Sequence, residues 1–538
     1  MNPTADKNLQ HDAIALARAW QNRANELLTA EEKAYQKQIQ HLLTHPEDKV
    51  TLTRMLDRSF RSKNYRKVAD QVSTLLRKNG IPGFFSPTEK ILMHLFLSVG
   101  RHLPNLSIPK MIAKMRADSS RSVIPGESEV LRAHLAKRKR QGIRMNINHL
   151  GEAVLGEKEA GHRLQAYIRD LQDPAVEYIS VKISTIYSQI QTLAFDHTVE
   201  VLSERLTRLY RTAAANEFER TDGRRVPKFV NLDMEEYRDL AITTAAFTRT
   251  LDHDEFKEHA AGIVLQAYLP DSFNIQKELT AWACRRVAAG GAPIKIRIVK
   301  GANLEMELVE ASLCNWPLAP YDNKLDVDAN YKRMVHYGTD PAIMPAVHLG
   351  IASHNLFELA YACKLAERNG VTAYFSFEML EGMANHVRRA IEEMTGEVLL
   401  YAPVASRKEF INAIAYLVRR LDENTGEENF LRYAPNLTTR SEQWGFLKER
   451  FRAACRHRDQ APDKPNRIQD RRHEEFPGKM GTYYEGEFNN EPDTDWSLAA
   501  NRKWAQAIRD RWQKKAGDRL IPIPLVIAGE EIFDGRQV

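Results

Sequence analysis

The segment Ala261-Gly-Ile-Val-Leu-Gln-Ala-Tyr268 is followed, after one helical stretch, by Ile294-Lys-Ile-Arg-Ile-Val-Lys300. Both segments are short, rich in β-branched residues and apolar enough for strands that are buried on both faces. Strands that alternate with helical stretches predict βαβ units, in which neighbouring strands run parallel. This pair therefore indicates an α/β fold built on a parallel sheet.

The same alternation extends in both directions from this pair and predicts eight strands. They are expected at Arg144–Leu150, Glu177–Ser184, Lys228–Asp233, Ala261–Tyr268, Ile294–Lys300, Ile343–Ala352, Val371–Phe377 and Val398–Pro403. Amphipathic stretches such as His354–Arg368 and Arg407–Asp422 follow them. Eight such repeats predict closure into a (β/α)8 barrel.

Three regions follow from this reading of the chain. Residues 1–141 show helical periodicity almost throughout and carry no chemical motif, which predicts an all-helical accessory region. Residues 142–436 form the expected barrel. Residues 437–538 are charged and Pro-punctuated, which predicts a linker with a helix at Ser497–Lys515 and a strand-like segment at Ile521–Ile527.

Composition and charge are those of an ordinary globular protein. Hydrophobic residues make up 43% and charged residues 28% of the 538 residues, and the net charge of +6 is too weak a bias to imply nucleic-acid binding. The one dense basic run is Lys137-Arg-Lys-Arg140. It is interpreted either as a solvated helix face or as a contact for anionic lipid headgroups.

The cysteines and the start of the chain indicate the cellular compartment that we expect for the protein. The four cysteines are widely separated and lack metal-ligand spacing, so we expect no metal site and a reducing cytoplasm. The start of the chain is polar, and no apolar run approaches the roughly 20 residues of a membrane helix. Any contact with a membrane is therefore expected to be peripheral.

Polar side chains gather where the predicted strands end, which is where barrel enzymes keep their chemistry. Any one of them alone is explained as a helix cap or the partner of a neighbour, but together they indicate a site. They are Glu152, Lys182, Asp233, Gln266, Arg297, Lys300, His354 and Tyr401.

The segment Tyr416-Leu-Val-Arg-Arg-Leu-Asp-Glu-Asn424 lies on the helix predicted after the eighth strand. Arg419 and Glu423 are one helical turn apart and share a face, while Arg420 lies about 100° around the helix. One interpretation is an exposed ion pair. The other is a pair of guanidinium groups that binds a carboxylate, because the planar fork of arginine matches two oxygens.

At this point the sequence resembles the proline dehydrogenases, specifically the dehydrogenase half of the bifunctional proline-utilisation flavoenzymes. The resemblance covers most of the chain, including a linker-like Asn490–Trp496. Its motifs are Tyr-Leu-Val-Arg-Arg-Leu-x-Glu-Asn at 416–424, Arg-Ile-Val-Lys-Gly-Ala at 297–302, Ser-Val-Lys-Ile-Ser at 180–184, Asn-Leu-Asp at 231–233, Ser-His-Asn at 353–355 and Tyr-Ala-Pro-Val at 401–404.

The resemblance implies a substrate site for L-proline. Arg419, Arg420 and Lys182 would bind its carboxylate, Tyr401 and Leu380 would shape the pocket around its ring, and Glu152 would pair with Arg419 in a gate. It also implies Asp233 as the partner of Lys182 or Arg297. The catalytic set implied in this way is Lys182, Asp233, Arg297 and Tyr401, and Glu423 belongs to the substrate-binding helix.

The resemblance further implies FAD as the cofactor. A cation beside the flavin suits the negative charge that reduction places on it. By residue type alone, Gln266 and Arg297 could instead be a barrel-lining pair, and His354 could cap a helix. The expected cofactor-binding residues are Gln266, Arg297, Val299, Lys300, Gly301, Ser353, His354 and Asn355.

The implied reaction is hydride transfer from proline C5 to flavin N5, which gives Δ1-pyrroline-5-carboxylate, and the electrons then pass to a membrane quinone, either ubiquinone or menaquinone. A cytoplasmic, peripherally membrane-associated protein is expected, and it could form a homo-oligomer. Residues 521–536 resemble only the opening of the aldehyde-dehydrogenase half of a longer parent, so we expect no NAD-dependent activity. Asn303 stands where many family members carry an aromatic residue.

Two other functions fit parts of the sequence. A flavin-free barrel lyase would use Lys182 as a Schiff-base lysine with Asp233 as a proton shuttle, but it leaves Arg297 and the two arginines of the helix unused. A DNA-binding regulator would need a short strand before its helices, and residues 1–50 begin directly with a helical pattern, so no DNA partner is expected.

Overall fold

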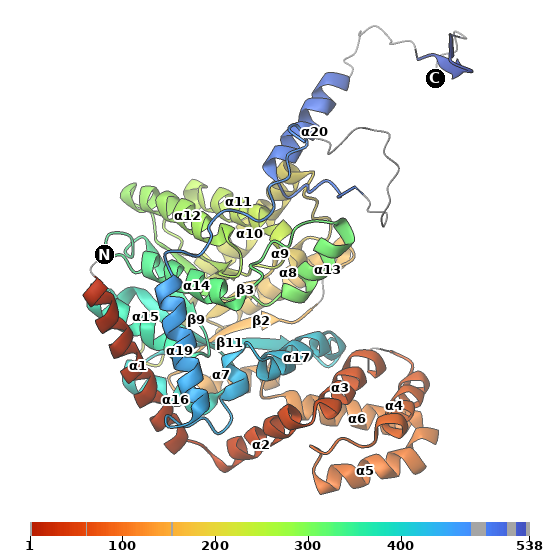
Figure 1. Ribbon diagram of the computed structural model, residues 1–538, viewed down its shortest axis with the longest axis vertical. Helices are drawn as coiled ribbons and strands as arrows, with labels where there is room; N and C mark the ends of the chain where they lie inside the picture. Colours follow the sequence, from red (N-terminus) through yellow and green to blue (C-terminus); the bar gives the residue numbers. More distant parts are fainter. Residues whose placement is uncertain (1–2, 61, 152–153, 475–490, 514–522, 534–538) are drawn as a thin grey trace. The chain divides into compact units, whose positions relative to one another are not determined.

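The computed structural model describes residues 3–60, 62–151, 154–474, 491–513 and 523–533. Within them, eight parallel strands form a closed barrel, because β11 pairs with both β10 and β2 (Figure 1). The barrel strands are β2 (Arg144–His149), β3 (Tyr178–Val181), β6 (Phe229–Leu232), β7 (Gly262–Gln266), β8 (Ile294–Val299), β9 (Val347–Ala352), β10 (Phe375–Leu380) and β11 (Val398–Ala405).

The predicted (β/α)8 barrel is therefore confirmed. The largest displacement of a strand concerns the seventh, which the sequence pattern placed at Val371–Phe377. In the structure Thr372–Tyr374 form a single 3-10 turn, and β10 begins at Phe375 and continues to Leu380. A short apolar run does not distinguish such a turn from the strand that follows it.

Helices surround the barrel and alternate with its strands. They are α8 (Glu157–Gln172), α9 (Ile183–Ile186), α10 (Phe195–Ala214), α11 (Tyr237–Leu251), α12 (Asp271–Ala288), α13 (Leu304–Cys314), α14 (Lys324–Gly338), α15 (Leu356–Asn369), α16 (Asn385–Thr395), α17 (Phe410–Thr425), α18 (Phe430–Tyr433) and α19 (Glu442–His457). A small hairpin of β4 (Glu217–Glu219) and β5 (Arg225–Pro227) lies between α10 and β6.

The N-terminal region is helical, as expected. It consists of α1 (Pro3–Glu26), α2 (Ala30–Thr44), α3 (Pro46–Arg54) with a π-turn at Met55–Ser59, α4 (Tyr65–Asn79), α5 (Pro87–Ser98), a 3-10 turn at Gly100–His102, α6 (Pro104–Ser119) and α7 (Ser128–Arg140), with the two-residue strand β1 (Ile124–Pro125) on β11. Helix α1 lies against α15 and α16, and its fully buried Trp20 meets the ring of Phe377 edge-on at 5.9 Å.

Helix α17 packs against the barrel on one side and the N-terminal helices on the other. Ile414 belongs to the apolar core of α4 and α6, together with residues such as Val72 and Ile108. Leu421, two turns further on, packs against Ile39 and Leu42 of α2. The N-terminal helices therefore hold the helix that carries both candidate substrate-binding arginines.

The chain divides into two compact units, Met1–Arg467 and Ile468–Val538. The second unit contains α20 (Ala499–Trp512), which overlaps the predicted helix, and a hairpin of β12 (Leu525–Ile527) and β13 (Glu530–Ile532). Part of the predicted strand at residues 521–527 lies outside the described residues. None of the described helices combines the length and the apolar character that crossing a bilayer requires.

A histidine beneath the barrel makes stability depend on pH. His259 is 6% exposed, and its ring lies 5.2 Å from that of Tyr210. Burial lowers the pKa of His259 to about 4. Because the pKa in the unfolded chain is higher, near 6.5, the unfolded state takes up the proton first as the pH falls.

We therefore expect the stability contribution of neutral His259 to be complete above pH 6.5 and to be lost as the pH falls towards 4. The loss is about 1.4 kcal/mol per pH unit, or about 2 kcal/mol between pH 6.5 and 5. Urea unfolding of the parent and of His259→Phe at several pH values measures it. Between pH 6.5 and 5 the free energy of unfolding should fall less for the variant than for the parent. An equal fall in both proteins would show that His259 is not buried as a neutral ring.

Candidate active site

A cavity of about 340 Å³ opens at the carboxyl ends of the barrel strands. Each candidate site residue that the structure describes contributes to its wall. These residues are Lys182, Asp233, Gln266, Arg297, Val299, Lys300, Gly301, Ser353, His354, Asn355, Leu380, Tyr401, Arg419, Arg420 and Glu423. Glu152, the expected gate residue, lies outside the described residues.

Asp233 and Tyr401 form the polar centre of the cavity. The Tyr401 hydroxyl donates to Asp233 at 2.8 Å, and the side-chain amides of Asn148 and Asn231 donate at 3.2 and 3.1 Å. Burial, reinforced by the Asp233 carboxylate, raises the pKa of Tyr401 well above its ordinary value. Tyr401 therefore keeps its proton at neutral pH and acts as a hydrogen-bond donor.

The contacts of Asp233 differ from those expected, because its hydrogen-bond donors are neutral groups. The expected partners pair elsewhere: Lys182 Nζ lies 3.5 Å from Glu235, and Arg297 Nε lies 2.6 Å from Glu378. Burial raises the pKa of Asp233, and Arg297 opposes this shift more than Lys182 does. Both cations thus act on Asp233 through space.

Arg297 is held inside the barrel by a carboxylate that the sequence did not single out. Glu378 is fully buried and contacts both Arg297, at 2.6 Å, and Lys295, at 2.5 Å. Lys295 and Arg297 lie two residues apart on β8, so their side chains emerge on the same face. Burial disfavours the Glu378 carboxylate, but the two cations hold its pKa below the ordinary value. The Arg297 guanidinium also lies over the Tyr401 ring, 4.9 Å from its centroid.

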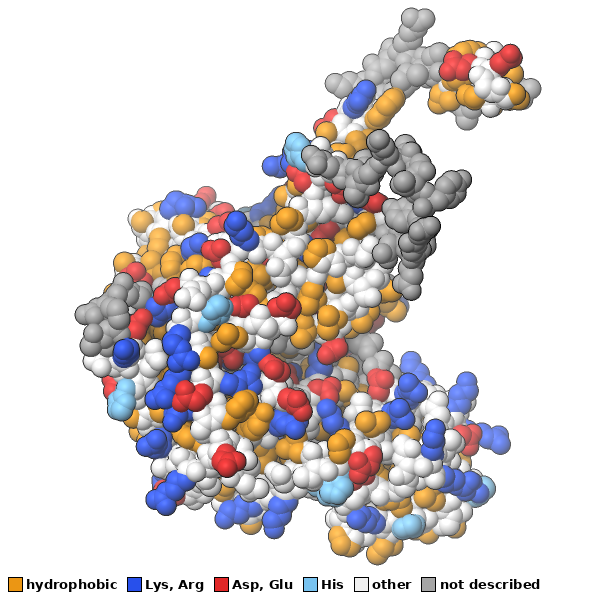
Figure 2. Space-filling model, viewed as in Figure 1, with side chains coloured by type: hydrophobic (Ala, Val, Ile, Leu, Met, Phe, Trp, Pro, Cys, Tyr) orange, Lys and Arg blue, Asp and Glu red, His pale blue; other side chains and the backbone are white. Residues whose placement is uncertain are grey.

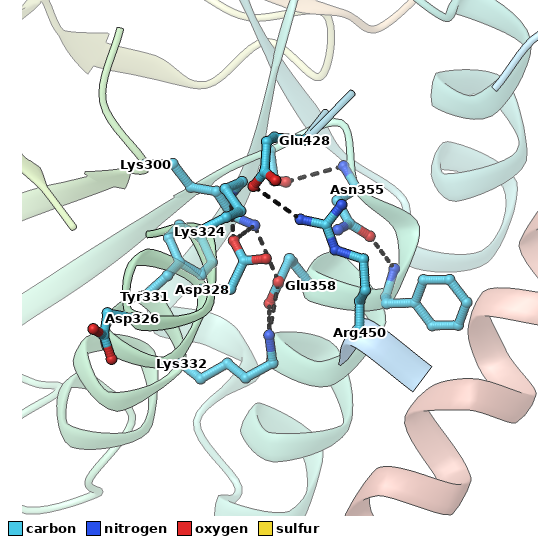
Figure 3. Close-up of polar contacts among 12 residues, drawn as sticks. Lys300, Lys324, Asp326, Asp328, Tyr331, Lys332, Asn355, Glu358, Glu428 and Arg450 are labelled. Carbon is cyan, nitrogen blue, oxygen red and sulfur yellow. Dashed lines mark hydrogen bonds and ion pairs between the residues drawn. The ribbon is translucent and has the colours of Figure 1, made fainter. Parts of the chain in front are cut away.

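A second cluster of charges lies beside Lys300 (Figure 3). Lys300 Nζ is 2.6 Å from Asp328 and 3.1 Å from Glu358. Lys324 also contacts Asp328, and Lys332 contacts Glu358 at 2.7 Å. Three lysines face two carboxylates, so the cluster has an excess of one positive charge. Its members other than Lys332 line the cavity.

Of this cluster, only Lys300 lies at a predicted strand end and was therefore expected in the site. Lys324, Asp328 and Lys332 lie on α14 at successive four-residue spacings, which is a pattern for ion pairs along a helix face. This spacing was the only sign of the cluster in the sequence. It does not show whether the charged helix face is buried or exposed. In the structure burial lowers the pKa of Lys324 to about 8, with Lys300 adding to the effect.

Helix α17 presents Arg419 and Arg420 to the cavity. The ion pair of this segment is Arg420 with Glu423, at 2.5 Å, and not Arg419 with Glu423 as the shared helix face suggested. Residues three apart are also neighbours on a helix, and the guanidinium of Arg420 lies 4.7 Å from the ring centroid of Tyr416. Arg420 is therefore oriented by two partners, whereas Arg419 forms no ion pair with any described residue.

His354 and the neighbouring Asn355 make different contacts. Asn355 caps α15 by accepting a hydrogen bond from the Phe357 amide at 3.0 Å. His354 Nε2 accepts from the backbone amide of Leu380 at 3.1 Å, and burial, with the charge of Arg420, lowers its pKa to about 3. His354 is thus a neutral ring that lines the cavity and not the helix cap.

Gly301 allows the backbone to approach the cavity closely. Its φ is +127°, and a Cβ at this position would lie 2.4 Å from the ring of Tyr268. A side chain here is excluded both by backbone conformation and by space. Asn303, the departure from the family pattern, lines the cavity just before α13 begins at Leu304.

Buried polar atoms around the cavity lack partners among the described residues. They are Asn148 Oδ1, Gln266 Oε1, His354 Nδ1, Tyr416 OH and Arg420 Nε. An unpaired buried polar atom is costly, so such a set is typical of a site that a polar ligand completes. The set mixes donors and acceptors and adjoins cationic side chains, which fits a ligand that carries amide-like and anionic groups.

Comparisons with known proteins identify the family of this chain. The family model for proline dehydrogenase matches residues 131–433. The chain is similar to the solved structure of proline utilization A from Corynebacterium freiburgense, at 37% identity and a TM-score of 0.62 over 79% of this chain and 39% of that one.

Proline utilization A from Bdellovibrio bacteriovorus, solved after inactivation by N-propargylglycine, is similar at 26% identity and a TM-score of 0.72, over 98% of this chain and 50% of that one. The chain therefore spans about two fifths to one half of the length of these solved proteins. No curated protein sequence matches the chain.

Proposed function

Because this chain belongs to the proline dehydrogenase family, we propose that it oxidises L-proline to Δ1-pyrroline-5-carboxylate, with FAD as cofactor. One observation carries the proposal: the family match at residues 131–433 contains all the described candidate site residues that line the strand-end cavity. The reaction removes a hydride from C5 and a proton from the ring nitrogen, which leaves a C=N bond.

The proposed carboxylate site consists of Lys182, Arg419 and Arg420. Three cations that line the same cavity favour an anion over water, and arginine can contact both carboxylate oxygens. Tyr401 and Leu380 would bound the proline ring. Tyr401 remains protonated, so it positions the substrate and does not accept the proton of the ring nitrogen.

The proposed cofactor site uses other described residues that line the same cavity. FAD, when bound, supplies the two-electron acceptor for the reaction. Arg297, fixed by Glu378, would place a permanent positive charge beside it, and Gln266 and His354 would meet its polar ring atoms. The excess positive charge around Lys300 and Lys324 suits a diphosphate. Val299, Gly301, Ser353 and Asn355 would complete the wall.

The proposal extends to the route of the electrons. We propose that they pass to a quinone in a membrane, with which the protein associates peripherally from the cytoplasm. We further propose that the product is consumed by an aldehyde-dehydrogenase partner, because the similar solved proteins are named for proline utilization and extend well beyond the shared region.

One spectrum tests cofactor and substrate together. The purified protein is expected to be yellow, with flavin absorbance that bleaches when L-proline is added without oxygen. An added quinone should restore the absorbance. A colourless protein that gains no activity on addition of FAD would contradict the proposal, and trapping of Lys182 by borohydride with a carbonyl substrate would indicate lyase chemistry instead.

Two substitutions should separate the substrate site from the cofactor site. Lys182→Ala is expected to raise KM for proline while the flavin content stays at the parental level, because Lys182 is assigned to the carboxylate. Arg297→Met is expected to lower flavin occupancy or shift the reduction potential of the bound flavin. Absorbance ratios and potentiometric titration measure both quantities. Parental flavin content and potential in Arg297→Met would refute the assignment of this arginine.

A further inference from the structure

Helix α5 and the start of α6 expose a row of large apolar side chains. Ile91, Leu92, Leu95, Val99, Leu103 and Leu106, which we call the apolar edge, are between 51% and 66% exposed. Single exposed apolar residues are common on protein surfaces, but a contiguous group is typical of a binding surface.

These side chains are exposed because α5 carries apolar residues all around the helix, and only some of them can face the core. Phe96 points inward to the core that α4 and α6 share, and Met93 and Leu97 pack against that core. Ile91, Leu92 and Leu95 of the same helix are exposed instead. The outer face of a surface helix is ordinarily polar, so the apolar edge calls for a partner that covers it.

The segment around the apolar edge is strongly basic. Residues 62–115 contain nine Lys or Arg and two Asp or Glu, although the whole chain has a net charge of only +6. Lys90, Arg101 and Lys110 lie in or beside the edge, and none of them forms an ion pair with another residue that the structure describes. Figure 2 shows Lys and Arg side chains next to hydrophobic ones over this lower part of the molecule.

We propose that the apolar edge and its flanking cations form the surface by which the protein docks on an anionic lipid membrane. This inference rests on the proposed transfer of electrons to a membrane quinone, and it names the surface. Apolar side chains inserted at the headgroup level, with Lys and Arg beside them, are the two signals that interfacial binding combines. A protein partner for so basic a surface would have to be acidic, whereas a membrane of anionic lipid supplies both the charge and the apolar layer.

The basic run at Lys137–Arg140 is a poorer candidate for this surface. Arg138 pairs with Glu381, which is 2% exposed, so its charge is turned inward. Lys139 lies over the ring of Phe218, 5.0 Å from its centroid. Only Lys137 and Arg140 of the run are exposed, and Val130 is the one large apolar side chain of α7 that is exposed beside them.

Co-sedimentation with vesicles tests the proposal. The full chain is mixed with vesicles of phosphatidylcholine alone or with an equal part of phosphatidylglycerol. One variant removes the apolar contact (Leu92→Ser, Leu95→Ser and Leu103→Ser), and a second removes the charges (Lys90→Gln, Arg101→Gln and Lys110→Gln). The matched controls are Leu313→Ser, at an 80% exposed leucine of α13, and Lys137→Gln with Arg140→Gln.

We expect the parent and both controls to bind the anionic vesicles and each edge variant to bind at least about tenfold more weakly. Parental binding by both edge variants, equal binding to neutral vesicles, or loss of binding only in the Lys137 and Arg140 control would overturn the proposal. So would a parent that ignores vesicles but self-associates through the edge, as seen by light scattering.

Proline-dependent reduction of a soluble dye, measured on the same samples, separates this inference from the proposed function. Dye reduction at the parental rate in all variants, combined with weaker vesicle binding by the edge variants, supports both. Dye reduction without any effect of the edge variants on binding refutes the docking surface alone. Vesicle binding through the edge without dye reduction refutes the proposed reaction alone.

Discussion

Replacing Arg419 or Arg420 with Met is expected to lower kcat/KM for L-proline about 10- to 150-fold. Each replacement removes a charge-assisted hydrogen bond worth about 1.5–3 kcal/mol, and about 1.4 kcal/mol corresponds to a factor of ten. Methionine keeps the apolar stem of the side chain, so the change isolates the guanidinium. Steady-state kinetics with flavin-normalised enzyme measure the effect.

The loss should appear mainly in KM. The carboxylate is remote from the C5–H bond, so it is bound alike in the ground state and the transition state. Of the two variants, Arg420→Met should be the more severe, because Arg420 also neutralises Glu423 and stacks on Tyr416. Arg419 has no such partner among the described residues.

Pyrrolidine, which lacks the carboxylate, supplies the control. It should be a poor substrate of the parent, and both substitutions should change its kcat/KM little. If both variants keep the parental kcat/KM for proline, the arginines belong to a surface ion pair and the substrate assignment is wrong.

Replacing Glu378 with Gln is expected to cost about 3–5 kcal/mol of unfolding free energy, because it leaves two buried cations without their shared carboxylate. Glu378 is fully buried between Lys295 and Arg297, at 2.5 and 2.6 Å. The amide keeps the shape of the side chain, so the loss reports the charge. Urea unfolding at neutral pH measures it, and the flavin content should fall at the same time because Arg297 loses its orienting partner.

A second substitution tests the cause. The double variant Lys295→Met with Glu378→Gln removes one of the stranded cations, so it should be more stable than Glu378→Gln alone. Arg23→Gln, which breaks an ion pair with Glu393 between two exposed side chains, serves as a matched control and should leave the free energy of unfolding nearly unchanged. If Glu378→Gln were as stable as this control, the buried ion pairs of Glu378 with Lys295 and Arg297 would make no net contribution to the free energy of unfolding.

The positions of the elements could be predicted from the sequence because their signals are local. An apolar, β-branched run such as Ile294–Lys300, followed by a stretch of helical period, indicates a strand and a helix wherever it occurs, and eight repeats indicate a barrel. Strand ends then meet at one rim, which is why Lys182, Asp233 and Tyr401 could be assigned to one cavity before any coordinates. The misplaced seventh strand shows the limit, since a turn at Thr372–Tyr374 has the same composition as a strand.

The ion-pair partners of the charged groups could not be predicted from the sequence, because they depend on contacts between segments that are distant along the chain. Glu378 meets Arg297 across 81 residues, and Lys300 meets Glu358 across 58. Nothing local distinguishes these buried carboxylates from exposed ones, and the same holds for the outward face of α5, whose apolar pattern reads as core. Helical and strand periods are properties of a short window of chain, whereas burial and ion pairing depend on which windows the fold brings together.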